Sequence, residues 1–152
     1  MRRLFATQAG WSGLILRLGL GIVMFPHGMQ KLVGWFGGHG FAETYQMFTQ
    51  GMHIPAVLAV LVILAESLGS IGLIVGCLTR IAAFGLLCNM IGAIAMVHWR
   101  NGFFMNWFGQ QAGEGFEYHL LAIAISLALV IAGAGNWSLD ALIGRPAKQP
   151  AA

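Results

Sequence analysis

The sequence predicts an all-α polytopic membrane protein: a four-transmembrane-helix bundle with both termini in the cytoplasm. Of its 152 residues, 58% are hydrophobic and 9% are charged, whereas soluble domains carry about 25% charged residues. Four apolar runs each contain about 20 residues, which lets a helix rising about 1.5 Å per residue cross a hydrocarbon core of about 30 Å. We expect a single domain over residues 1–144 and a disordered tail over residues 145–152, which lacks the apolar content needed for packing.

The first apolar run extends from Ser12 to Phe36 and contains Arg17. Two arginines precede it, as in a signal peptide, but a signal peptide has an apolar region of only about 7 to 15 residues. We therefore expect a retained first helix. The loop that follows, from Gly37 to Ile54, begins with glycines and then mixes aromatic and polar residues. This composition is typical of a short helix at the membrane interface.

The second run extends from Pro55 to Gly76 and contains Glu66, and the third extends from Arg80 to His98. Only three residues separate these runs, so they are predicted to form a tight antiparallel hairpin. Glycine is frequent inside the runs, and small residues allow helix backbones to approach closely in lipid.

The fourth run extends from Tyr118 to Ala134, after a second loop from Trp99 to Glu117. This loop is rich in phenylalanine and tryptophan, and such residues anchor proteins at the depth of the lipid headgroups. We therefore expect the loop to lie at the membrane surface opposite the termini.

The distribution of basic residues predicts the orientation, because cytoplasmic loops carry an excess of lysine and arginine. The basic residues on the side of the termini are Arg2, Arg3, Arg80, Arg145 and Lys148. Only Arg100 and Lys31 lie toward the other side. The formal net charge of +3 is thus a topology signal, and no nucleic-acid partner is expected.

Arg17 and Glu66 are the most informative residues, since a charge at the centre of a membrane helix costs about 2.5 to 3.5 kcal/mol. Their estimated depths differ by about 7 Å, much of which an extended arginine can cover. We therefore predict an Arg17–Glu66 ion pair, which acts either as a structural clamp or in ligand or proton handling. Ser70 adds a polar group one turn below Glu66. Without a cation in reach, Glu66 would instead be protonated and donate a hydrogen bond.

A second polar cluster is predicted near the other face of the membrane. Its members are His27, Lys31, His98, Arg100, Glu117 and His119. Histidine exchanges protons near neutral pH or binds metals, but these histidines lack the paired spacing of a helical metal site, so no metal is predicted. On the last helix, His119 rather than Glu117 should face the interior, because Ala122, Ser126 and Gly133 continue its face.

Together, the two groups predict a polar pocket inside the membrane, although they identify no catalytic residue. The candidate pocket residues are Arg17, His27, Lys31, Glu66, Ser70, His98 and His119.

Several motifs follow one another along the chain: Leu16-Arg17-Leu18-Gly19, Phe25-Pro26-His27-Gly28, Glu66-Ser67-Leu68-Gly69, Leu78-Thr79-Arg80, Gly115-Phe116-Glu117-Tyr118 and Ser138-Leu139-Asp140. With them, the chain resembles the DoxX family of small bacterial inner-membrane proteins. The resemblance covers nearly the whole chain in order. It implies a four-helix multi-pass protein of the bacterial inner membrane, in a family linked to quinone-coupled oxidation, quinone resistance and oxidative stress.

Three functions remain open, and the sequence does not decide whether the chain is an enzyme. The first is a redox- or quinone-linked membrane component, with a quinone as the only suggested cofactor. The second is a non-catalytic anchor or assembly partner of a membrane or peripheral oxidoreductase. The third is a permease for protons or a small solute, for which chains would have to assemble into a homo-oligomer. The chain contains no CxxC motif that would suggest thiol exchange of its own.

Overall fold

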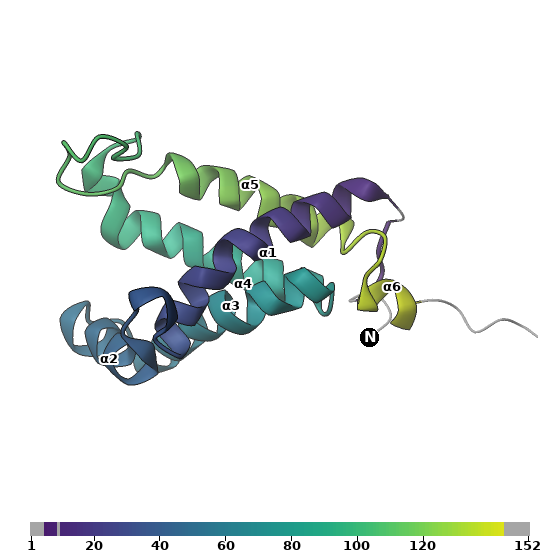
Figure 1. The fold of residues 1–152 in the computed structure, drawn as a ribbon, viewed down its shortest axis with the longest axis horizontal. Helices are drawn as coiled ribbons and strands as arrows, with labels where there is room; N and C mark the ends of the chain where they lie inside the picture. Colours follow the sequence, from purple (N-terminus) through teal and green to yellow (C-terminus); the bar gives the residue numbers. More distant parts are fainter. Residues whose placement is uncertain (1–4, 9, 145–152) are drawn as a thin grey trace, which may run out of the picture.

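The computed structural model describes residues 5–8 and 10–144, which contain helices and connecting turns and no strand. The long helices are α1 (Trp11–Leu32), α3 (Ala56–Val75), α4 (Thr79–Ala93) and α5 (Glu117–Ala132). The π-helical turn η3 (Ile94–His98) and the 3-10 turn η4 (Trp99–Asn101) extend α4. The short elements are η1 (Trp35–Gly37), α2 (Gly40–Gln46), η2 (Met47–Gly51) and α6 (Leu139–Ile143). Figure 1 shows the long helices side by side, with α2 at one end of the bundle and α6 at the other.

The predicted helical membrane bundle is confirmed in this coarse form. Three helices are long and apolar enough to cross a membrane, namely Trp11–Leu32, Ala56–Val75 and Thr79–Asn101. The fourth, α5, is apolar but has only 16 residues. The predicted tail over residues 145–152 lies outside the described residues, as do the basic residues Arg2, Arg3, Arg145 and Lys148.

Two glycines bring α1 close to α3. A methyl group at Gly28 would overlap the backbone of Glu66 and Ser67, and one at Gly21 would meet the carbonyl oxygen of Ser70 at 3.1 Å. Since neither glycine carries a Cβ atom, the two helices approach at backbone distance, as small residues allow in lipid. This approach places the outer half of α1 beside Glu66.

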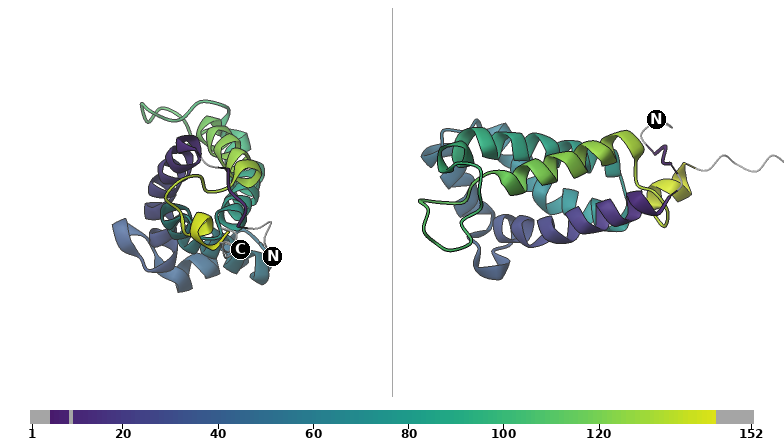
Figure 2. Two further views of the ribbon diagram at one scale, coloured as in Figure 1. Left: turned by 90° about the vertical axis from the view of Figure 1, so that its right-hand side faces the viewer. Right: turned by 90° about the horizontal axis from the view of Figure 1, so that it is seen from above.

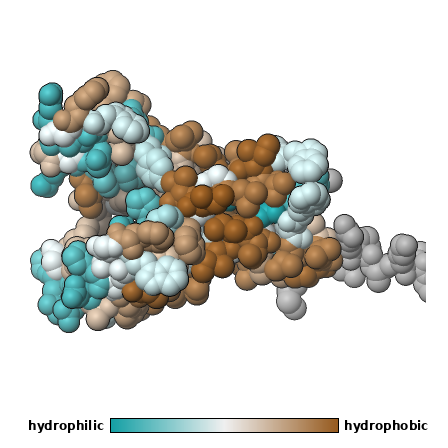
Figure 3. Space-filling view, in the orientation of Figure 1, coloured by the Kyte–Doolittle hydropathy of each residue, from teal (hydrophilic) through white to brown (hydrophobic). Residues whose placement is uncertain are grey.

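The apolar side chains divide between a core and an outer belt. The core, shared by all four long helices, contains Leu20, Met24, Leu73, Ala83, Leu86, Met90, Ala122 and Leu129. Outward-facing residues such as Ile15, Leu61, Phe84 and Ile131 are more than half exposed. Figure 3 shows the resulting hydrophobic band around the middle of the molecule, with hydrophilic residues concentrated at the α2 end. This band is the surface expected to contact lipid chains.

The α3–α4 hairpin is tight, as predicted, and α6 closes it. Gly76 ends α3 with φ 69°, and Leu78 follows at φ 51°. The carboxylate of Asp140 then accepts hydrogen bonds from the backbone N–H groups of Leu78 (2.8 Å) and Thr79 (2.9 Å). A carboxylate at this position satisfies the unpaired donors at the start of α4 and complements the helix dipole. The sequence did not predict α6, a helix of five residues.

We predict that Asp140→Ala lowers the free energy of unfolding by about 2 kcal/mol, because a part-buried and a buried N–H group at the start of α4 lose their acceptors. Asp140→Asn, which keeps one acceptor oxygen, should lose less. Thermal unfolding followed by circular dichroism in detergent measures both. Glu43→Ala, which removes an exposed carboxylate, is the matched control, and an equal effect of the two alanine variants would contradict this role.

Candidate functional site

Arg17 is buried to 1% exposure at the α6 end of the bundle, where all its hydrogen bonds go to backbone carbonyls. Its acceptors are the carbonyl oxygens of Ala134 (3.1 Å), Leu73 (3.0 Å), Ile74 (2.6 Å), Asn136 (3.4 Å) and Trp137 (2.6 Å). A guanidinium group has five N–H donors, so five acceptors satisfy it fully. Arg17 therefore joins α1 to the end of α3 and to the segment between α5 and α6.

The predicted ion pair between Arg17 and Glu66 is wrong. The guanidinium group reaches the last turn of α3, where Leu73 and Ile74 lie, and Glu66 pairs with other residues. The last four carbonyls of a helix lack partners within it and carry its negative partial charge. They therefore attract a cation as a carboxylate would. The depth comparison used Cα positions alone and could not indicate which way the long side chain turns.

We predict that Arg17→Met lowers the free energy of unfolding by about 3 kcal/mol or more, because several buried carbonyls lose their donor. Arg17→Lys should recover only part of this loss, since an ammonium group has three donors instead of five. Thermal unfolding in detergent provides the measurement, with the exposed Arg100→Met as control. A melting temperature for Arg17→Met equal to that of the control would show that the carbonyls do not depend on this cation.

Glu66 is the centre of a separate polar group in the other half of the bundle. Its side chain is 7% exposed, and its Oε2 atom forms an ion pair with the Lys31 ammonium group. Its Oε1 atom accepts a hydrogen bond from the Asn89 side-chain amide. Three helices, α1, α3 and α4, thus each supply one residue. Both carboxylate oxygens are paired, as a buried charge requires.

Sequence reasoning missed Asn89, although a signal was present. Asn89 is the only amide side chain inside the third apolar run, and an amide within a membrane helix usually faces other helices. Lys31 was predicted as a pocket residue, but in the second polar cluster near the other face of the membrane rather than beside Glu66. The close approach of α1 and α3 at Gly28 explains this, because Lys31 lies one turn further along α1 and reaches inward.

Ser70 is fully buried, but its hydroxyl does not join the Glu66 group. It donates to the carbonyl oxygen of Ser67 at 2.8 Å, and the Ser67 hydroxyl donates to the carbonyl oxygen of Ile63 at 2.6 Å. Both hydroxyls are therefore engaged by the backbone of α3 itself, a common arrangement for serine in membrane helices. The structure gives Ser70 a packing role beside Gly21.

Two of the three predicted histidines meet. The rings of His98 and His119 lie 4.1 Å apart between centroids, and His119 is buried whereas Glu117 is only partly so. The Nδ1 atom of His98 lies 2.8 Å from the carbonyl oxygen of Glu114. Because a carbonyl oxygen only accepts, this Nδ1 atom carries the proton. The Nδ1 atom of His119 is buried and has no hydrogen-bond partner among the described residues.

The remaining outer residues are less closely joined. His27 is exposed on α1, and Arg100 is exposed on η4. The Glu117 carboxylate accepts a hydrogen bond from the Trp107 indole at 3.4 Å. The Tyr118 hydroxyl donates to the Met24 sulfur at 3.3 Å, a contact that links α5 to α1.

Lys31 also borders an open hollow of about 240 Å³. The lining residues are Gln30, Lys31, Gly37, Gly38, His39, Thr44 and Met47. The Lys31 side chain is 24% exposed, so it borders the hollow while its ammonium group pairs with the buried Glu66. Figure 1 shows α1 and α5 diverging toward the end of the bundle that carries α2. In the same orientation, Figure 3 shows a notch in the surface between the α2 region and the loop that precedes α5. The Glu66 group is thus close to the surface through Lys31.

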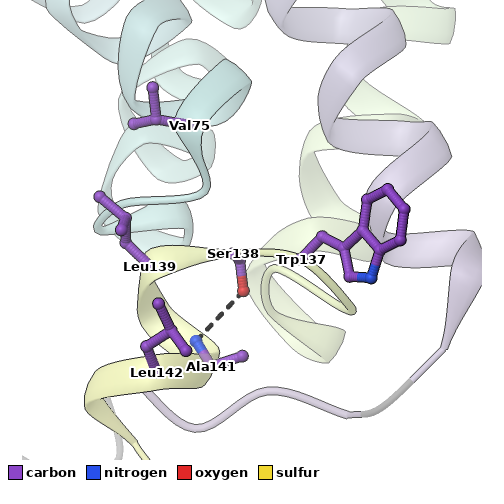
Figure 4. Close-up of a pocket in the computed structure, with 6 residues that line it drawn as sticks. All are labelled: Val75, Trp137, Ser138, Leu139, Ala141 and Leu142. Carbon is purple, nitrogen blue, oxygen red and sulfur yellow. Dashed lines mark hydrogen bonds between the residues drawn. The ribbon is translucent and has the colours of Figure 1, made fainter.

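A second hollow, of about 230 Å³, lies at the α6 end and is drawn in Figure 4. Its lining residues are Val75, Trp137, Ser138, Leu139, Ala141 and Leu142. No charged residue is among them, and the Ser138 hydroxyl already accepts the Ala141 N–H group at 3.1 Å. This hollow offers a ligand little beyond apolar contact.

These features define a polytopic helical membrane protein with a buried ionic centre shared by three helices. Comparison with known proteins identifies the family, because residues 12–99 match DoxX. The chain is 32% identical over 116 residues to a Bacillus subtilis protein named "Putative oxidoreductase CatD", covering 76% of each chain. It is also 32% identical over 137 residues to an "Uncharacterized protein" of Haemophilus influenzae, covering 89% of this chain and 85% of that one. The chain therefore belongs to the DoxX family.

No solved structure matches the chain. Among the residues that the structure describes, no group of three His, Cys, Asp or Glu side chains is arranged to hold a metal ion.

We predict a non-additive effect on stability at the Glu66 group. Lys31→Met alone leaves a buried carboxylate without its cation and should cost about 3 to 5 kcal/mol. The double variant Lys31→Met with Glu66→Gln should lose much less, because no unpaired charge remains. A double-mutant cycle of unfolding free energies in detergent measures the coupling. Additive losses would mean that the ion pair does not form.

Proposed function

We propose that this DoxX-family protein is a redox-linked component of the bacterial inner membrane that binds a quinone at the Lys31–Glu66–Asn89 group. The main support is the buried carboxylate of Glu66, which residues of two other helices, Lys31 and Asn89, pair within the apolar bundle. Such residues are costly in lipid and are usually functional. We further propose, from the distribution of basic residues, that both termini face the cytoplasm.

The hollow beside Lys31 supports a ligand with a small polar head. Its volume of about 240 Å³ falls below the range of about 300 to 1,000 Å³ typical of pockets that enclose a whole ligand. A single substituted ring fits this volume, whereas an isoprenoid tail would remain among the lipid chains. A ring carbonyl oxygen could then accept a hydrogen bond from the Lys31 ammonium group, which Glu66 and Asn89 hold in place.

A quinone takes up two electrons and two protons when it becomes a quinol, so electrons must be supplied. We propose that they come from a partner oxidoreductase, because the sequence offers no CxxC motif of its own. The two protons would come from water at the end of the bundle opposite α6, where the rings of His98 and His119 contact each other. The name of the Bacillus subtilis relative, which includes the word oxidoreductase, is consistent with a redox role.

We predict that decylubiquinone raises the thermal unfolding temperature of the purified protein in detergent, because a ligand that binds only the folded state stabilises it. At a concentration one hundred times its Kd, the ligand contributes about 2.7 kcal/mol. Glu66→Gln and Lys31→Met should each abolish most of this shift, since the first releases Lys31 from its position and the second removes the donor.

The matched control is Arg100→Gln, which removes an exposed charge at the same end and should keep the full shift. Decane at equal concentration controls for binding of apolar chains alone. The proposal fails if decylubiquinone gives no shift in the wild-type protein. It also fails if both site variants respond as the wild type does.

A further inference from the structure

The helix α5 is shorter than a bilayer crossing requires. With 16 residues, α5 extends about 24 Å, which is about 6 Å less than the hydrocarbon core of a bilayer. The neighbouring helix Thr79–Asn101 has 23 residues and is long enough. Some other part of the chain must therefore complete the fourth crossing.

The two ends of α5 differ in how they continue. After Ala132, the chain runs through the buried residues Gly133, Ala134 and Gly135, where Gly133 lies against Ala6 and Thr7 and Gly135 lies against the start of α1. Before Glu117, the loop of residues 102–116 stands outside the bundle at the end opposite α6, as Figure 2 shows. At this second end, α5 is therefore continued by a segment that lies outside the bundle.

The loop has the composition of a membrane interface. Residues 102–113 contain no charged residue and no histidine. Three of their aromatic side chains are largely exposed: Phe104 (67%), Trp107 (79%) and Phe108 (88%). An exposed apolar patch of this kind indicates contact with a membrane or a partner, and tryptophan is enriched at lipid headgroup depth.

The loop also pairs several of its own polar groups, which favours an irregular backbone near hydrocarbon. The Asn106 side chain accepts the Gln111 N–H group (2.9 Å) and donates to the Gln111 carbonyl (3.2 Å). The Glu114 carboxylate accepts the Asn106 N–H group at 2.7 Å. The Glu117 N–H group donates to the carbonyl of Phe103 at 2.9 Å.

Packing between rings holds the base of the loop in place. Phe116 stacks on Trp99 at 5.5 Å and meets the edge of Phe103 at 5.7 Å between centroids. The indole N–H group of Trp107 reaches the carboxylate of Glu117, so its polar atom is paired while its ring faces outward. The loop thus presents Trp107 and Phe108 on an ordered support.

We infer that residues 102–116 insert into the lipid at the boundary between headgroups and acyl chains and complete the fourth crossing. The partner of this surface is the bilayer itself, in the leaflet opposite α6. The uncharged stretch of residues 102–113, the hydrogen bonds within the loop and the shortfall of α5 all favour lipid over a protein surface. This inference is independent of quinone binding.

We predict that brominated lipid quenches the fluorescence of Trp107, whereas a quencher dissolved in water does not. The protein is placed in phosphatidylcholine vesicles with bromine near the carbonyl end of one acyl chain, and the emission lost is compared between wild type and Trp107→Phe. The difference isolates Trp107 while leaving an apolar ring in the loop. Bromolipid should reduce this component at least about twofold, as expected for headgroup depth, and aqueous iodide should leave it nearly unchanged.

The opposite pattern, quenching by iodide and not by bromolipid, would overturn the inference and leave the loop available to a protein partner. Equal loss in both proteins would overturn it as well. Phe108→Ser provides a second measurement that does not depend on tryptophan. It should lower the unfolding temperature more in thick dierucoyl than in thin dimyristoleoyl phosphatidylcholine, because the loop matters most where α5 falls furthest short. The same loss in both bilayers would contradict the inference.

Discussion

The structure depends on the pairing of Arg17 with the backbone carbonyls at one end of the bundle. In lipid, an unpaired carbonyl has no water to bond to, and α3 and α5 both end inside the membrane-spanning domain. One guanidinium group supplies five donors to the end of α3 and to the segment between α5 and α6. The chain after α5 can therefore turn back through a buried segment, and the carboxylate of Asp140 reaches the start of α4. An arginine in the membrane thus has a structural purpose.

The other buried charge, Glu66, lies in a different situation. Its partners come from side chains on two other helices, and one of them, Lys31, also borders a hollow open to the surface. A fully enclosed pair would only hold helices together. If one residue of the pair lies at a surface, as Lys31 does, it can exchange some of its hydrogen bonds for hydrogen bonds to a ligand. The Glu66 group is therefore a better candidate for function than Arg17.

Much of the fold follows from the sequence by simple physical rules. The apolar run lengths predicted the long helices, the three-residue gap predicted the hairpin of α3 and α4, and helical spacing predicted that His119 rather than Glu117 faces the interior. The predictions failed where the outcome depends on the conformation of a long side chain. Arg17 was assigned to Glu66 because two charges at similar depth attract, while the unpaired carbonyls of α3 gave no signal in the sequence.

The sequence by itself determined the class of protein, since composition and run length depend only on the free energy of transferring residues into lipid. It also determined which residues must be shielded, namely the charges and amides inside the apolar runs. Only the tertiary structure decided which of them meet. That choice depends on the approach of α1 to α3 at Gly28, on helix ends that offer free carbonyls, and on the rotamers of Arg17 and Lys31. These are properties of helices packed together and are absent from any single segment.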